Sequence, residues 1–243
     1  MPRIEPFERH AREYDDWFDR NAGLYRAELK AVRRLLPGPG AEGMEVGVGS
    51  GMFAEPLGIG IGVEPSPSMA ERAAARGIEV HPGVAEDLPF PDGRFDFVLM
   101  VTTICFVDDV AVSFREAARV LRNGGSIIVG FVDRNSELGR RYLLRRDESR
   151  FYGEASFYST REVLDYLEEA GFSVTDTVQA LIPGEPPESV LEGSGRGSFV
   201  AIRGEKGQGS SDSLRQMAED PASSRAPPAP RGCVSRTCRS CCR

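Results

Sequence analysis

The sequence has no apolar run close to the ~18 residues that a membrane-spanning helix needs. Its first ten residues, MPRIEPFERH, lack the apolar segment of a secretory signal. Acidic side chains outnumber basic ones, 37 to 30, which argues against a nucleic-acid partner because phosphate binding requires a basic face. No internal repeat is visible. These absences favour a cytoplasmic globular protein with no membrane and no nucleic-acid partner.

Aliphatic residues also become scarce near the end of the 243-residue chain. Residues 205–243 are rich in Gly, Ser, Pro and Arg and predict a disordered tail, because so little apolar surface cannot offset the entropy of ordering. The tail contains four of the five cysteines, Cys233, Cys238, Cys241 and Cys242. Such thiols could ligate zinc or a soft metal, but their spacing matches no metal site that we can argue for, and no histidine lies nearby. We therefore predict one domain over 1–204, an incidental tail and no metal site.

Helical and strand-like patterns alternate along residues 1–204. Two helices are predicted within 7–36, and helix N-caps at Ser66, Asp109 and Ser159. The helix after Asp109 is expected to end at Asn123-Gly-Gly125. Strands are predicted at 43–48, 58–65, 77–83, 94–103, 126–133 and near 173–179 and 197–204. This alternation predicts an α/β fold with a doubly wound, mostly parallel sheet, which binds ligands at the carboxyl ends of its strands.

Three alternating glycines follow the first predicted strand. The stretch EVGVGSG (45–51) reads G-x-G-x-G and is followed by Met52, where a dinucleotide-binding fingerprint needs glycine. Glu45 precedes the turn, and a carboxylate there repels a pyrophosphate but favours a cationic ligand. Glu64 ends the next strand, where a carboxylate can accept hydrogen bonds from both hydroxyls of a ribose. A ribose combined with a positive charge indicates S-adenosylmethionine.

Four stretches in this order resemble the class I S-adenosylmethionine-dependent methyltransferases, most closely the small-molecule group of the ubiquinone-biosynthesis type. They are EVGVGSG (45–51), GVEPSPSM (62–69), GVAEDLPFPDGRFDFV (83–98) and EAARVLRNGGSIIVGF (116–131). The resemblance covers about residues 40–204. It implies a Rossmann-like, mostly parallel seven-stranded sheet with an antiparallel last strand and helices on both faces. It also implies that residues 1–36 form a helical lid over the cofactor.

The resemblance further implies ten cofactor contacts. They are Glu45, Gly47, Gly49 and Gly51 around the methionine part, Glu64 and Pro65 at the ribose, Ala85 and Glu86 at the adenine, and Val101 and Thr102 after the fourth strand. Two departures from the family pattern stand out. Val84 replaces an aspartate that often pairs with the adenine amino group, so base selection rests on backbone and packing. The short interval from Gly51 to Glu64 leaves the first helix about one turn shorter than usual.

No catalytic dyad is visible, and methyl transfer does not require one. The reaction is an in-line displacement that relies on alignment and exclusion of water, with a base needed only if the acceptor must lose a proton. Candidates near the reaction are Tyr14, Thr103 and Cys105, with plain helix packing for Tyr14 and an inert buried thiol for Cys105 as alternatives. Arginines within 140–150 would suit an anionic acceptor or simply form a solvated helix face.

We therefore predict an S-adenosylmethionine-dependent methyltransferase that acts on a small molecule. The alternatives are transfer to a macromolecule, cofactor binding without turnover, and methylation of arsenite or a thiol-bound metal through the tail cysteines. The sequence indicates neither the acceptor nor the oligomeric state.

Overall fold

The computed structural model describes residues 4–207. Most of the predicted tail, including its four cysteines, lies outside the described residues. Strand β8 (Phe199–Lys206) contains the first two residues assigned to that tail, so the folded region extends past the predicted boundary. No helix within 4–207 is long and apolar enough to cross a membrane.

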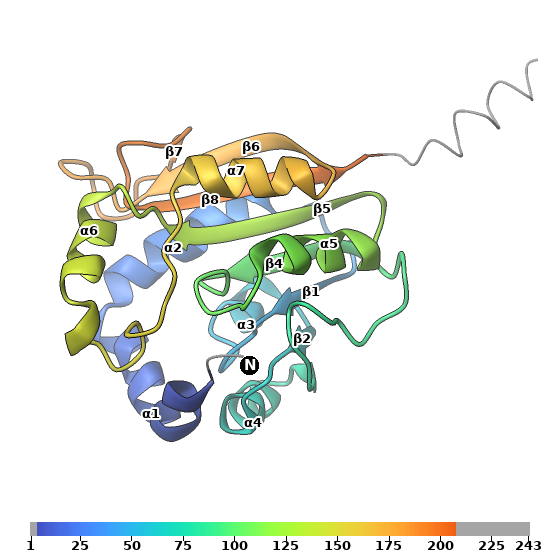
Figure 1. Cartoon of the computed structure of the whole chain (residues 1–243), viewed down its shortest axis with the longest axis horizontal. Helices are drawn as coiled ribbons and strands as arrows, with labels where there is room; N and C mark the ends of the chain where they lie inside the picture. Colours follow the sequence, from blue (N-terminus) through green and yellow to red (C-terminus); the bar gives the residue numbers. More distant parts are fainter. Residues whose placement is uncertain (1–3, 208–243) are drawn as a thin grey trace, which may run out of the picture. The chain divides into compact units, whose positions relative to one another are not determined.

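The described strands form one sheet in the order β3-β2-β1-β4-β5-β8-β6-β7 (Figure 1). Besides β8, they are β1 Gly43–Val46, β2 Ile61–Val63, β3 Glu79–His81, β4 Phe95–Val101, β5 Leu121–Val132, β6 Phe172–Ala180 and β7 Leu191–Glu192. Strands β1 to β5 pair in parallel, whereas β8 is antiparallel to both of its neighbours, β5 and β6. The predicted sheet type is confirmed. The count of seven is wrong because β7, two residues long, adds an eighth strand at the edge.

Helices pack on both faces of the sheet (Figure 1). They are α1 Glu5–Arg20, α2 Ala22–Leu35, α3 Ala54–Leu57, α4 Pro67–Ala75, α5 Val110–Val120, α6 Glu137–Leu144, the 3₁₀ helix η1 Arg146–Glu148 and α7 Thr160–Glu169. Alternate residues of a strand point to opposite faces. In β4, Val98 and Met100 therefore pack in the core under α5 and α7, while Phe97 and Leu99 pack in the core under α2 to α4.

The predicted helix starts are confirmed. Ser66 and Asp109 each accept a hydrogen bond from the backbone N–H three residues further on, and Ser159 forms a capping box with Glu162. These bonds satisfy N–H groups that have no partner inside the helix. The predicted short first helix is α3, which has a single turn.

The predicted end of α5 is wrong. The helix stops at Val120, and β5 begins at the next residue, so Asn123-Gly-Gly125 lie within the strand. There β5 bulges and shifts its register against β4. A Cβ at Gly125 would lie 3.0 Å from the carbonyl oxygen of Asp96. The glycine therefore allows close approach of two strands where the sequence pattern indicated a turn.

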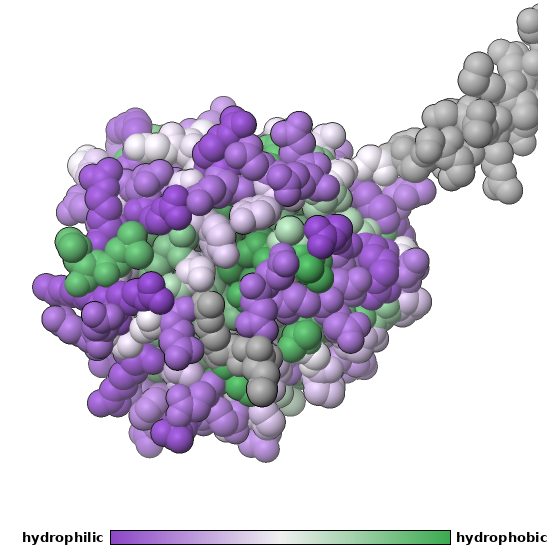
Figure 2. All heavy atoms as spheres, viewed as in Figure 1, coloured by the Kyte–Doolittle hydropathy of each residue, from purple (hydrophilic) through white to green (hydrophobic). Residues whose placement is uncertain are grey.

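The surface in Figure 2 is largely hydrophilic, as expected of helices that bury one apolar face. An apolar patch lies over α6. Leu144, at the end of that helix, is 88% exposed. Leu144 belongs to neither of the hydrophobic cores that cover the two faces of the sheet.

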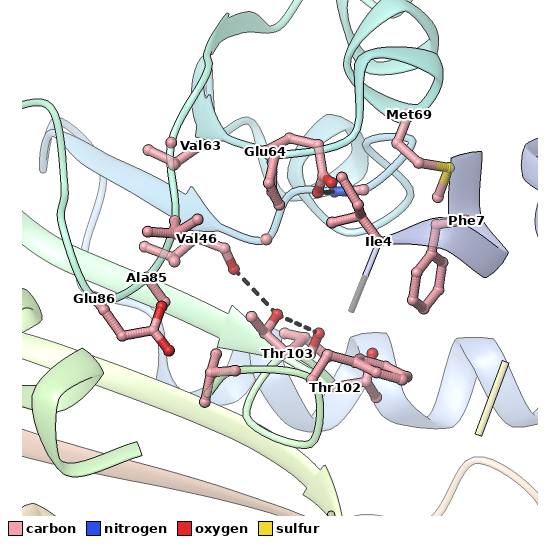
Figure 3. Close-up of a pocket in the computed structure, with 18 of the residues that line it drawn as sticks. Ile4, Phe7, Val46, Val63, Glu64, Met69, Ala85, Glu86, Thr102 and Thr103 are labelled. Atoms are coloured by element: carbon pink, nitrogen blue, oxygen red, sulfur yellow. Dashed lines mark hydrogen bonds between the residues drawn. The ribbon is translucent and has the colours of Figure 1, made fainter. Parts of the chain in front are cut away.

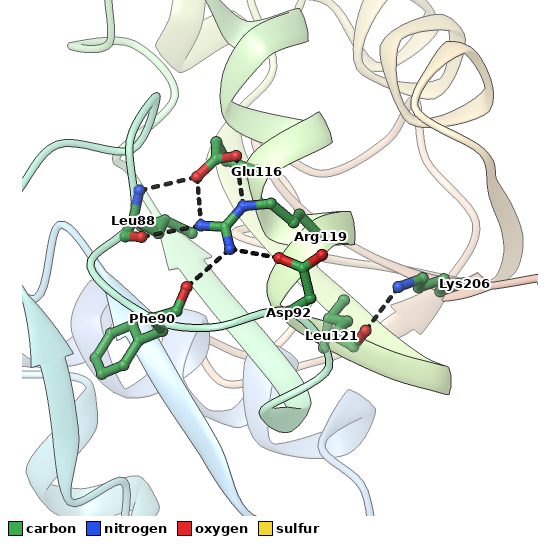
Figure 4. A network of polar contacts seen from close by, with 7 residues as sticks. All are labelled: Leu88, Phe90, Asp92, Glu116, Arg119, Leu121 and Lys206. Carbon is green, nitrogen blue, oxygen red and sulfur yellow. Dashed lines mark hydrogen bonds and ion pairs between the residues drawn. The ribbon is translucent and has the colours of Figure 1, made fainter.

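Arg119 on α5 anchors the loop between β3 and β4 (Figure 4). Its guanidinium donates to the carbonyls of Leu88 (2.9 Å) and Phe90 (2.8 Å) in that loop. It also forms ion pairs with Asp92 (2.9 Å) and Glu116 (2.8 Å). Glu116 in turn accepts the N–H of Leu88. The planar guanidinium has five N–H donors in fixed directions, so it can bond to the two carbonyls and the two carboxylates at once. An ammonium group is less suited to this arrangement.

Arg119→Ala should lower the free energy of unfolding by about 2–3 kcal/mol, because charge-assisted bonds are lost and loop carbonyls lose their partner. Urea unfolding followed by circular dichroism measures this. The control is Arg122→Ala, which removes half-exposed ion pairs to Glu42 and Asp96 and should cost less than about 1 kcal/mol. Equal losses in the two variants would contradict the anchoring role.

A chain ending at Lys206 should unfold within about 2 °C of the full chain. Lys206 completes β8, pairing with Phe172 and donating from Nζ to the carbonyl of Leu121 (2.7 Å). A chain ending at Arg203 lacks these contacts and should unfold at a clearly lower temperature. Scanning calorimetry compares the three proteins. A large loss in the chain ending at Lys206 would show that later residues contribute to the fold.

Candidate functional site

A cavity lies at the carboxyl ends of β1, β2 and β4 (Figure 3), and we call it the first cavity. Its lining includes eight of the ten predicted cofactor contacts: Gly47, Gly49, Glu64, Pro65, Ala85, Glu86, Val101 and Thr102. Tyr14 and Thr103, two of the three catalytic candidates, line it as well. The structure thus brings together residues from five separate segments. Glu45, Gly51 and Cys105 do not line this cavity.

Two glycines of the turn after β1 serve packing. Gly47 and Gly51 have positive φ angles of 66° and 85°. A Cβ at Gly47 would lie 2.5 Å from the side chain of Thr103, and one at Gly51 would lie 2.6 Å from that of Ile78. A side chain at either position would displace the neighbouring segment. The Cβ positions of these two glycines therefore face packed side chains, although the backbone of Gly47 also lines the first cavity.

Gly49 is the glycine that faces the cavity. A Cβ there would meet no atom closer than Met69 Cε at 3.6 Å, and the next neighbour is Tyr14 at 4.0 Å. Met69 and Tyr14 both line the first cavity. The missing side chain thus leaves room for a ligand to approach the backbone.

Glu64 closes the far side of the turn. Its carboxylate accepts the N–H groups of Gly49 and Ser66, each at 2.9 Å. Burial raises the pKa of Glu64, while these two donors lower it. A carboxylate offers about four lone-pair positions, so two donors leave capacity for two more. Only 8% of Glu64 is exposed, so those donors would have to come from a ligand within the cavity.

Glu45 lies outside the cavity wall, in β1. It is 2% exposed, and its Oε2 has no hydrogen-bond partner among the described residues. Burial raises the pKa of Glu45 well above its usual value; the N–H of Ala54 opposes this shift and the charge of Glu64 adds to it. The carboxylate thus lies near the start of the one-turn helix α3.

The loop after β3 forms another wall of the cavity. The Glu86 carboxylate accepts the N–H groups of Asp108 (2.7 Å) and Asp109 (3.1 Å), so it holds the segment before α5. Ala85 is buried, and Val84 also lines the cavity. Both bonds go to Oε1 of Glu86, so this wall offers backbone groups, apolar contacts and the second oxygen of that carboxylate.

Thr102 adopts an unusual conformation immediately after β4. Its φ is 52°, in the left-handed region that β-branched residues rarely enter. Its N–H donates to the carbonyl of Gly130 (2.7 Å) on β5, which stabilises this backbone. Sparsely populated conformations cluster at functional sites, and Thr102 lines two cavities that meet here.

Thr103 and Cys105 have structural partners. The Thr103 hydroxyl lies 3.1 Å from the carbonyls of both Val46 and Val101 and can donate its one proton to either, so it lies between the ends of β1 and β4 (Figure 3). The Cys105 thiol donates to the carbonyl of Thr102 and is buried in a separate aromatic cluster with Phe157. The inert buried thiol, rather than a thiol at the first cavity, matches this placement.

Helix α1 covers the first cavity with Phe7 and Tyr14. Glu8 fastens the helix to the start of α4. Its carboxylate accepts the hydroxyls of Ser66 and Ser68, both at 2.6 Å, and the N–H of Ser68 at 3.1 Å. These three bonds lower the pKa of Glu8.

Tyr14 remains protonated near neutral pH. Burial raises its pKa, and the charges of Glu45 and Glu64 raise it further. The phenol can therefore donate a hydrogen bond at the cavity, but it is poorly suited to act as a base.

A second cavity adjoins the first, sharing Tyr14 and Thr102. The rest of its lining is mostly aromatic: Trp17, Phe18, Glu28, Phe53, Val132, Tyr142, Phe151 and Tyr152. Its volume is about 50 Å³, room for a few water-sized groups. The predicted arginines of 140–150 line neither cavity; Arg150, for example, pairs with Glu13 on α1 (2.8 Å).

Glu28 is the acidic residue of the second cavity, and the sequence analysis missed it. It is 5% exposed, and no hydrogen bond or ion pair links its carboxylate to another described residue. Burial raises the pKa of Glu28 to about 8. A signal was present in the sequence, because Glu28 lies three and four residues from Tyr25 and Val32 on the apolar stripe of its helix.

No group of three or more His, Cys, Asp or Glu side chains within residues 4–207 is placed to hold a metal ion. The two cavities instead combine backbone groups, aromatic rings and single carboxylates. Such a site suits an organic ligand with polar and apolar parts.

Comparison with known protein families and structures gives a consistent result. A family model described as a methyltransferase domain matches residues 44–129. The crystal structure of an S-adenosylmethionine-dependent methyltransferase from Thermotoga maritima, described as a possible histamine N-methyltransferase, is 49% identical to this chain. It superposes with a TM-score of 0.80 over 84% of this chain and 99% of the other.

Two curated relatives extend the comparison. An uncharacterised protein of Methanocaldococcus jannaschii is 44% identical over 82% of this chain and 98% of its own. A ubiquinone biosynthesis O-methyltransferase of Azorhizobium caulinodans is 29% identical over 60% of this chain and 64% of its own. The similarity to the Methanocaldococcus protein spans nearly the whole of that protein. The similarity to the O-methyltransferase has a lower identity and covers a smaller share of both chains.

Glu28→Gln should stabilise the protein, and the gain should grow with pH. The folded-state pKa near 8 lies above the reference value of 4.5, so the folded state favours the protonated carboxyl. Ionisation of Glu28 in the unfolded state therefore leaves the free energy of unfolding unchanged below pH 4.5 and lowers it progressively more between pH 4.5 and pH 8. Glutamine cannot ionise, so the variant should be more stable by roughly 3 kcal/mol at pH 7. The nearby tyrosines, Tyr14, Tyr142 and Tyr152, have raised pKa values and stay neutral in this range.

Urea unfolding at pH 5, 7 and 8 measures the effect. The control is Glu55→Gln, since Glu55 is a half-exposed carboxylate on α3 that pairs with Arg76. A stability difference for Glu28→Gln that does not change with pH would contradict the raised pKa.

Proposed function

The chain belongs to the class I S-adenosylmethionine-dependent methyltransferases, and we propose that it methylates a small molecule bound in the second cavity. S-adenosylmethionine supplies a methyl carbon attached to a positively charged sulfur. The first cavity is the place proposed for this cofactor. The observation that carries the proposal is the pairing of an open Gly49 with the buried Glu64 carboxylate.

The residues of the first cavity fit the cofactor. Glu64 accepts the two ribose hydroxyls with its remaining lone pairs, and Pro65 packs beside it. The turn at Gly47 and Gly49 bounds the methionine part. Gly51 and Glu45 act from outside the wall, the first by packing and the second through its bond from the N–H of Ala54 at the start of α3.

The adenine is assigned to the wall formed by the loop after β3. Ala85 and the backbone of Glu86 contact the base, while the Glu86 side chain keeps its bonds to Asp108 and Asp109. Arg119 holds this loop on α5 and so acts indirectly. Base selection then depends on backbone groups and shape, which is consistent with valine at position 84.

Transfer takes place where the two cavities share Thr102 and Tyr14. Val101 and Thr102 bound the methyl group, and α1 acts as a lid whose aromatic rings exclude water. Thr103 positions the ends of β1 and β4 without touching the acceptor. The limited volume of the second cavity supports a small acceptor over a macromolecule.

Glu64→Ala should weaken binding of S-adenosylhomocysteine roughly 10–100-fold, because two charge-assisted hydrogen bonds to the ribose are lost and water replaces them only in part. Isothermal titration calorimetry measures the affinity, and circular dichroism checks that the variant is folded. Gly49→Val should abolish binding, since its side chain would occupy the open space at the turn.

The matched control is Glu79→Ala, which removes an exposed carboxylate on the neighbouring strand β3 and should leave the affinity unchanged. Unchanged affinity in a folded Glu64→Ala variant would remove Glu64 from the site. Failure of the native protein to bind S-adenosylhomocysteine would refute the proposed function.

A further inference from the structure

Glu28 has no role in the proposed cofactor site, although its burial is costly. A carboxylate taken out of water loses its hydration and is normally paired or hydrogen-bonded in return. Glu28 is 5% exposed and lacks such a partner among the described residues. It instead borders the second cavity. A buried acid that borders a cavity can take a hydrogen-bond or ionic partner from a ligand bound there.

Aromatic rings surround the same space. Tyr142 and Tyr152 stack with ring centroids 5.2 Å apart, and both line the second cavity. Trp17 and Phe18 line it from α1. Aromatic faces attract cations through their quadrupole, and the attraction is stronger where water is excluded. Rings combined with a single carboxylate therefore favour an ammonium group.

The charges near the cavity disfavour other acceptors. An anionic acceptor would face the Glu28 carboxylate, and the arginines of 140–150, all within the described range, do not line the cavity to offset it. A neutral alcohol offers no positive charge to offset Glu28 when its carboxyl ionises. A cation is the acceptor that this lining can neutralise.

We propose that the second cavity binds the ammonium group of a small amine against Glu28, which makes the enzyme an N-methyltransferase. This inference rests on the proposed function, because it requires the methyl donor in the first cavity. The shared residues Tyr14 and Thr102 place the two ligands next to each other.

Glu28 also supplies the proton acceptor that an ammonium ion needs before it can react. The ammonium group gives one proton to the Glu28 carboxylate and becomes a neutral amine with a lone pair. The nitrogen then bonds to the methyl carbon while the C–S bond breaks and leaves its electron pair on sulfur. The products are S-adenosylhomocysteine and a methylated ammonium ion, and Glu28 releases its proton to solvent. Because burial raises the pKa of Glu28 to about 8, it can accept this proton near neutral pH.

The test uses the full chain with methyl-labelled S-adenosylmethionine. The acceptors are ethylamine, n-propylamine and n-butylamine, which suit the small second cavity, each beside the alcohol with the same carbon skeleton. Labelled product should form from amines and not from the alcohols. For the best amine, Glu28→Gln should lower kcat/KM at least about 100-fold, as expected when a buried charge loses its partner. Its affinity for S-adenosylhomocysteine should remain within about twofold of the native value.

A pH profile separates this role from a structural one. In the native enzyme kcat/KM should rise with pH toward the pKa of Glu28, and this rise should be absent in Glu28→Gln. Glu55→Gln, outside both cavities, should retain the native profile. Stability of Glu28→Gln, measured by urea unfolding, shows whether any loss of activity comes from misfolding.

Three results would overturn the inference: methylation of alcohols in preference to amines, no methylation of any amine while S-adenosylhomocysteine binds, or full amine activity in Glu28→Gln. Each leaves the proposed cofactor site intact. Failure of the native protein to bind S-adenosylhomocysteine would instead contradict the proposed function itself.

Discussion

The buried carboxylate of Glu64 is the contact on which the geometry of the site depends. It holds the N–H groups of Gly49 and Ser66, so it fixes the turn after β1 relative to the start of α4. Ser66 is also the N-cap of α4 and donates its hydroxyl to Glu8 on α1. One series of hydrogen bonds therefore sets the relative positions of three segments that lie far apart in the sequence.

The electrostatics of the site come from local carboxylates rather than from the net charge of the chain. Burial raises the pKa values of Glu28, Glu45 and Glu64, and the charge of each raises the pKa of Tyr14. All three thus act on the residue at which the two cavities meet. A positively charged ligand on either side of Tyr14 would be favoured, which suits both a sulfonium donor and an ammonium acceptor.

The sequence predicted those features that depend on neighbouring residues. Caps at Ser66, Asp109 and Ser159 follow from side chains that bond a nearby N–H, and the apolar strands follow from burial on both faces. Features set by distant partners were missed. The bulge at Gly125 depends on Asp96 in another strand, and the packing role of Gly51 depends on Ile78.

The functional site shows the same difference between features set by neighbouring residues and features set by distant ones. The pattern around Gly49 and Glu64 has a local spacing that a sequence can reveal, and both residues line the first cavity. Glu28 was overlooked because an acid on a helix is usually solvated, and only the assembled α1, α2 and 142–152 region encloses it. Cys105 looked close to the reaction by its position after β4, but its thiol is directed into a separate cluster.

The position of β8 in the sheet also affects how the protein is made. This strand lies between β5 and β6, although both are synthesised before it. Until the ribosome has passed Lys206, each of those strands has a row of backbone N–H and C=O groups without its final neighbour. Open strand edges of this kind pair readily with other chains. The nascent protein is therefore most prone to aggregation in the interval after β6 has been synthesised and before β8 is available to pair with it.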